Sequence, residues 1–136
     1  MPTIAEQAKA LHERTVAVRR DLHRHPEVAF EEHRTMAVIV ARLRELGLEP
    51  REGVGGTGVV AVFDTGRPGP TVLARADMDA LPVAEEKSVA YRSTVPGKMH
   101  ACGHDGHVAV LLSVAEIIVA RAAQLAGRVV FVFQPA

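Results

Sequence analysis

The densest group of reactive side chains lies within residues 99 to 107, where the sequence reads MHACGHDGH. It contains three imidazoles, one thiol and one carboxylate, and imidazole and thiolate are usual ligands of zinc-like divalent ions. If the backbone is extended here, His100, Cys102 and His104 project to one face, because side chains alternate along an extended chain. The spacing therefore predicts that two or three of these side chains share one divalent ion.

A second group of candidate residues, Asp77 and Asp79, lies in the segment RADMDALP, directly after an apolar run. In open α/β sheets, ligand sites gather beyond the carboxyl ends of the strands. Carboxylates there can bind a hard ion or orient a ligating histidine. Asp79 is the stronger functional candidate, because Pro82 fixes the chain beside it, whereas acids after a strand also commonly cap a loop.

Other clusters favour simpler interpretations. The segment Arg20–Glu27 carries two histidines, and we interpret it as a solvated, hydrogen-bonded helix end. A Cys102–His104 nucleophilic pair is disfavoured, because extended geometry places the imidazole beside the thiol instead of facing it. The glycines of residues 53 to 58 lack the Lys-Ser/Thr ending of a phosphate-binding loop. A structural zinc site would need four protein ligands around one ion. The three histidines and the cysteine of MHACGHDGH are too close together in the sequence for all four to surround one ion.

Length and composition indicate a globular domain. The chain has 136 residues, 48% of them hydrophobic, with 16 basic and 16 acidic side chains, so it can bury one core. Zero net charge and 4% aromatic residues argue against nucleic acid and anionic membranes as partners. The expected partners are small molecules or other protein chains. A single cysteine and the lack of a signal-peptide pattern predict a cytoplasmic location.

Hydrophobic periodicity predicts three helices and three strands. The helices are expected over residues 4–22, 31–46 and 104–123, and the strands over residues 59–64, 71–76 and 127–133. The first two strands are expected to be neighbours, and residues 81–98 to form an irregular loop that rims a site. This order predicts an α/β fold, a layered mixed sheet with helices on both faces.

Five segments carry a resemblance to a known family. They are RRDLHRHPEVAFEE, GGTGVVA, RADMDALPVAEE, MHACGHDGH and VVFVFQPA, in that order. With them the chain resembles, over nearly its whole length, the M20 family of metallopeptidases. Within that family it is similar to the amidohydrolase branch of hippurate hydrolases, N-acyl amino acid amidohydrolases and auxin-conjugate hydrolases. The resemblance implies the N-terminal part of a zinc-peptidase-like catalytic domain with two co-catalytic metals.

The same resemblance implies roles for individual residues. Cys102 and His104 match metal ligands, and Asp79 matches the catalytic acidic residue that supports the metal centre. Zinc, manganese or similar divalent ions would be the cofactors. Asp77 receives no ligand role, because other branches of the family carry His-x-Asp at this position.

The resemblance also implies that residues 1–136 form an incomplete catalytic domain. In relatives, the strand that ends near Gln134 is followed by two glutamates, one acting as general base and one as a ligand. A smaller lid domain, often used for dimerisation, would also lie outside this chain, so a homo-oligomer is expected only for the complete protein.

The expected function is metal-dependent hydrolysis of N-acyl or N-aroyl amino acid amide bonds by the complete protein, the fragment itself being inactive. The alternative is a non-catalytic metal-binding or interaction module on a hydrolase-derived scaffold. The acyl specificity, the native ion and the roles of Asp77, His100 and His107 stay open at this point.

Overall fold

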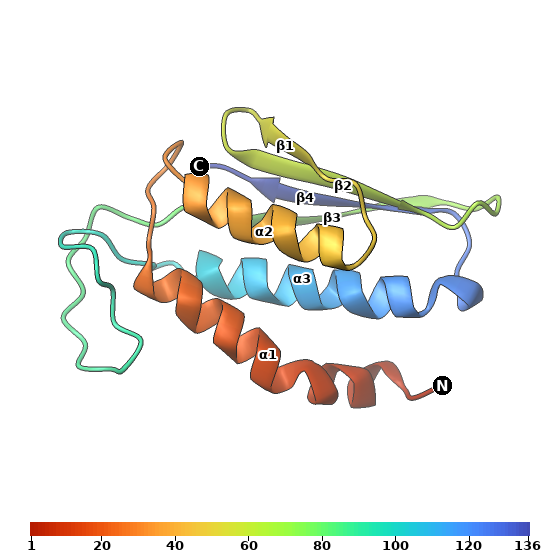
Figure 1. Ribbon diagram of the computed structural model, residues 1–136, viewed down its shortest axis with the longest axis horizontal. Coiled ribbons are helices and arrows are strands. Elements are labelled where there is room, and N and C mark those ends of the chain that lie inside the picture. The colour runs from red at the N-terminus through yellow and green to blue at the C-terminus, as the bar shows by residue number, and fades with distance from the viewer.

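A computed structural model describes all residues from 1 to 136 and contains three α-helices and four β-strands (Figure 1). The helices are α1 (Ile4–Arg24), α2 (His33–Glu45) and α3 (His104–Ala120), and a short 3₁₀ turn, Ala122–Gln124, follows α3. The strands are β1 (Arg51–Val54), β2 (Gly58–Asp64), β3 (Thr71–Asp77) and β4 (Arg128–Gln134). All six predicted elements are present, and β1 is an additional strand. No helix is both long and apolar enough to cross a lipid bilayer.

The four strands form one mixed sheet in the order β1-β2-β4-β3. β4 runs antiparallel to β2 and parallel to β3, and Phe131 of β4 pairs with Ala61 on one side and Ala74 on the other. The prediction that β2 and β3 are neighbours is therefore wrong. Strands that are close in sequence usually pair, but here β4 lies between them.

The helices form two further layers below the sheet in Figure 1. α2 and α3 pack on the sheet, and α1 packs on α3 instead of on a strand. The core between these layers includes Phe131, Phe133, Ile39, Leu43 and Val108, each at most 1% exposed. At the far end of α1, Thr3 and Glu6 form a capping box that begins the helix.

The α/β class with a layered mixed sheet is confirmed, but the prediction of helices on both faces of the sheet is not met. All three helices lie on one side (Figure 1), because α1 buries its apolar side against α3. Two apolar side chains of the strands, Val62 and Leu73, are 49% and 61% exposed, as expected for a sheet face that no helix covers. Residues 78 to 103 connect β3 to α3 as the predicted irregular loop, which is tied by short bridges between Leu81 and Met99 and between Val28 and Ala80.

Candidate metal site

A cluster of three side chains lies where β3 ends and α3 begins. Asp77 is the last residue of β3, and His104 and His107 lie in the first turn of α3. One ligand atom from each of these three residues lies within 4.8 Å of the other two. The packing of α3 against β3 thus brings together residues that are far apart in the sequence, and we refer to Asp77, His104 and His107 as the open cluster.

Both histidines face the Asp77 carboxylate. The Nδ1 atom of His107 lies 2.6 Å from Asp77 Oδ1, and the Nε2 atom of His104 lies 3.3 Å from Asp77 Oδ2. The two imidazole rings stack with their centroids 5.4 Å apart. His104 and His107 can share one partner because residues three apart on a helix lie on the same face.

Asp79 fixes the orientation of the His104 ring. His104 Nδ1 lies 2.9 Å from Asp79 Oδ1 and 3.0 Å from the Asp79 carbonyl oxygen. Both oxygens accept hydrogen bonds, so Nδ1 is the donor to them, and Nε2 faces Asp77 and His107, where its lone pair would be available to a bound ion in the neutral ring. A carboxylate behind a ligating histidine fixes the ring orientation and raises the basicity of the ligand.

The open cluster is charged and partly accessible. Burial alone would raise the pKa of Asp77, but the hydrogen bond from His107 and the charges of His104 and His107 outweigh it and hold the pKa below its ordinary value. The Asp77 and His104 side chains are 18% and 19% exposed, and His107 is 57% exposed. One carboxylate and two imidazoles match the donor chemistry of zinc and similar divalent ions.

A groove of about 420 Å³ lies beside the open cluster. It is lined by Arg75, Asp77, Gly106, His107, Val110, Leu111 and Val114. Because two members of the cluster form part of its wall, an ion or a small molecule can reach the cluster from solvent.

The residues predicted from MHACGHDGH do not lie on one face. His100 is buried, Cys102 is exposed, and the backbone bends at Cys102 and Gly103, where Gly103 has a left-handed φ of +83°. Extended geometry therefore ends before His104, which explains why the alternation argument fails. His104 and Asp79 are brought together, whereas Cys102 lies outside the open cluster and stays a predicted ligand.

The sequence interpretation left two members of the open cluster without a role. Asp77 and His107 were not assigned, although the three-residue spacing from His104 to His107 at a helix start is a signal for a shared face. The interpretation of Arg20–Glu27 as a solvated helix end is wrong at His23, which is 1% exposed. The loop that covers His23 contains Glu85, far along the chain, so local sequence could not reveal this burial.

Comparisons with known proteins identify the family of the chain. Residues 73–136 match the Peptidase family M20/M25/M40. The chain is 43% identical to N-acetylcysteine deacetylase of Bacillus subtilis over 129 residues, which are 94% of this chain and 34% of that protein. It is 46% identical to IAA-amino acid hydrolase ILR1-like 2 of Arabidopsis thaliana over 121 residues, 89% of this chain and 27% of that protein.

A solved structure gives the same result for the fold. The Bacillus subtilis YXEP protein, described as a dinuclear metal binding peptidase from the M20 family, superposes with a TM-score of 0.89 at 43% identity. The match covers 94% of this chain and 36% of that one. The chain thus spans about a third of the length of the relatives that it matches. By motif order, sequence identity and backbone geometry, this chain belongs to the peptidase family M20/M25/M40, on its amidohydrolase side.

Proposed function

We propose that the whole protein to which this chain belongs is a metal-dependent amidohydrolase that cleaves N-acyl amino acids. Two relatives support this substrate class by their names, which refer to an N-acetylated amino acid and to an amino acid conjugate. In both, an amide nitrogen belonging to an amino acid is released from an acyl group. The catalytic residue that we assign within this chain is Asp79, acting next to the metal ligands.

The observation that carries the proposal is the orientation of His104. Its Nδ1 atom is held by Asp79, and its Nε2 atom faces Asp77 and His107. A bound divalent ion would polarise the amide carbonyl of a substrate and lower the pKa of a bound water. In this chain, His104, Asp77 and His107 would hold the ion, and Asp79 would keep the His104 ring in its ligating tautomer.

We propose Cys102 as a further ligand. Its thiol is exposed on the bend two residues before His104, and Gly103 between them has open space around its α-carbon. A thiolate at this place could approach an ion bound by His104 after a local rotation of the backbone. In this proposal the chain supplies metal ligands, whereas the general base lies elsewhere in the whole protein.

The test compares the whole protein with the 136-residue chain. Hydrolysis of N-acetyl amino acids is measured after loading with Zn²⁺ or Mn²⁺, for wild type and for Asp79→Asn. We expect turnover by the whole protein, a loss of at least ~10-fold in the variant, and no turnover by the 136-residue chain. Metal binding without turnover by the whole protein would favour a non-catalytic metal-binding module, and turnover by the 136-residue chain would show that the base lies within it.

A further inference from the structure

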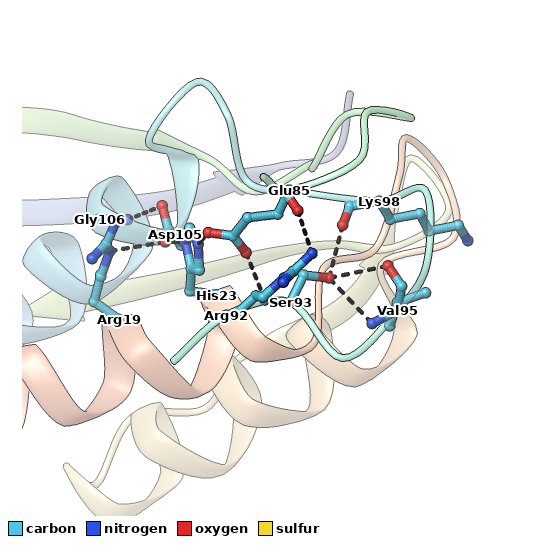
Figure 2. A network of polar contacts seen from close by, with 9 residues as sticks. All are labelled: Arg19, His23, Glu85, Arg92, Ser93, Val95, Lys98, Asp105 and Gly106. Atoms are coloured by element: carbon cyan, nitrogen blue, oxygen red, sulfur yellow. Dashed lines mark hydrogen bonds and ion pairs between the residues drawn. The ribbon is translucent and has the colours of Figure 1, made fainter. Parts of the chain in front are cut away.

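A second cluster of polar side chains is buried where the first turn of α3 meets α1 and the long loop (Figure 2). It consists of His23, Glu85 and Asp105, which are 1%, 5% and 0% exposed. His23 lies at its centre: its Nδ1 atom is 2.7 Å from Asp105 Oδ2 and its Nε2 atom is 2.9 Å from Glu85 Oε1. We refer to His23, Glu85 and Asp105 as the closed cluster.

Asp105 connects the closed cluster to the metal ligands. It is the second residue of α3 and lies between His104 and His107 in the sequence. Its carboxylate accepts from His23 Nδ1, from Arg19 Nε at 2.9 Å and from the backbone N–H of Gly106 at 3.0 Å. The first turn of α3, which carries two members of the open cluster, is therefore held against α1 through one carboxylate.

Glu85 connects the closed cluster to the long loop. It accepts from the backbone N–H of Ser93 at 2.6 Å, and Arg92 donates to the Glu85 carbonyl oxygen at 2.7 Å (Figure 2). Burial alone would raise the pKa of Glu85, but the hydrogen bonds from Ser93 and His23 outweigh it and keep the pKa below its ordinary value. Tyr91 of the same loop packs edge-on against the His23 ring, with centroids 5.5 Å apart.

We propose that His23 is a positioning residue for the metal site and acts through Asp105. Its Nδ1 hydrogen bond sets the rotation of the first turn of α3, so that His104 and His107 both face Asp77. The Nε2 hydrogen bond to Glu85 holds the loop of residues 78 to 103 against α1 and is not expected to affect the metal site. This inference rests on the proposed metal site and adds to it a residue from α1 that touches no ligand.

Two amide substitutions separate the two hydrogen bonds. The side-chain nitrogen of asparagine stands near the place of Nδ1, and that of glutamine near the place of Nε2. His23→Asn therefore retains the bond to Asp105 and loses the bond to Glu85, whereas His23→Gln does the reverse. A residue that only supports folding would respond alike to both changes.

The experiment is a Co²⁺ titration of the 136-residue chain at neutral pH, with the dissociation constant and the visible absorption of the bound ion as readouts. We expect His23→Gln to raise the dissociation constant by ~10- to 100-fold and to change the spectrum, as loss of an outer partner of a metal site does. His23→Asn should retain the wild-type spectrum and a constant within about threefold of wild type. Glu116→Gln is the matched control, because Glu116 pairs with Arg14 and Arg42 away from the site.

Each outcome decides the proposal. Equal constants and spectra for His23→Gln and wild type, or equal losses for His23→Gln and His23→Asn, would overturn it. If His23→Gln does not fold, Arg19→Gln removes the other side-chain donor to Asp105 and is expected to raise the constant by ~10-fold; no change would overturn the proposal. If the wild-type chain itself binds no Co²⁺, the open cluster as a metal site and the role of His23 fail together, and turnover by the whole protein decides the proposed function separately. Binding by wild type and by His23→Gln alike removes only the role of His23.

Discussion

The open and closed clusters contain the same residue types but differ in how their hydrogen-bonding capacity is used. In the closed cluster both ring nitrogens of His23 face carboxylate oxygens, and Asp105 accepts from three donors. In the open cluster the contacts are looser and partly accessible to solvent: the Nε2 atom of His104 lies 3.3 Å from Asp77, and His107 is 57% exposed. Buried histidine and carboxylate side chains with short contacts on every side hold the fold together, whereas the same groups in a looser, partly exposed arrangement can bind an ion.

The largest expected effect concerns the stability of the closed cluster. His23→Ala leaves Asp105 and Glu85 buried without their shared donor, and removal of one partner from such a buried group costs about 3 to 5 kcal/mol. We expect this loss in the free energy of unfolding of the metal-free chain, measured by urea denaturation. A loss below ~1 kcal/mol would show that the closed cluster does not hold the fold.

The next effect is the pH dependence of stability caused by His100, whose two ring nitrogens are buried without hydrogen-bond partners. Burial is the main reason that its pKa falls from 6.5 to about 4. Below pH 6.5 the unfolded chain therefore gains a proton that the folded chain does not, so stability declines by about 3 kcal/mol as the pH falls towards 4.

His100→Leu tests this prediction. It removes the titrating ring without breaking a hydrogen bond, and should flatten the stability curve between pH 6.5 and 4 in metal-free buffer. His12→Gln, an exposed substitution on α1, is the control and should leave the curve unchanged. Parallel curves for wild type and His100→Leu would contradict the assigned cause.

The third effect concerns binding by the open cluster. His104→Ala removes the only ring held by Asp79, and we expect the Co²⁺ dissociation constant to rise by at least ~100-fold, or about 2.7 kcal/mol. The urea midpoint of the metal-free chain should change little, because the side chain is partly exposed. A large loss of stability with unchanged binding would reverse the distinction between the two clusters.

The smallest effect concerns Cys102. If the thiolate joins the site, Cys102→Ser should remove the sulfur-to-cobalt charge-transfer absorption and weaken binding by ~10-fold, or about 1.4 kcal/mol. An unchanged spectrum would mean that Asp77, His104 and His107 bind the ion without it.

Local patterns predicted the helices and three of the strands, and the family resemblance implied that Asp79 supports the metal ligands Cys102 and His104. They did not predict β1, because Arg51–Val54 is short, carries two charges and has no alternating apolar side chains. They misplaced β3, because its partner β4 follows only after α3, and local patterns do not show which distant strand will pair. His23 was missed for a similar reason: its burial is produced by Glu85 and Asp105, which the sequence separates from it by 62 and 82 residues.

The position of β4 has a consequence for how the protein is made. β4 is synthesised after β1, β2 and β3, yet it lies between β2 and β3. The β1–β2 pair can therefore form early, whereas β3 has no strand partner until β4 is made. The N–H of Met78, next to Asp77, also has its acceptor only on Gln134. During translation Asp77, at the end of β3, therefore gains its strand partner only when β4 is made, although His104 and His107 precede β4 in the sequence.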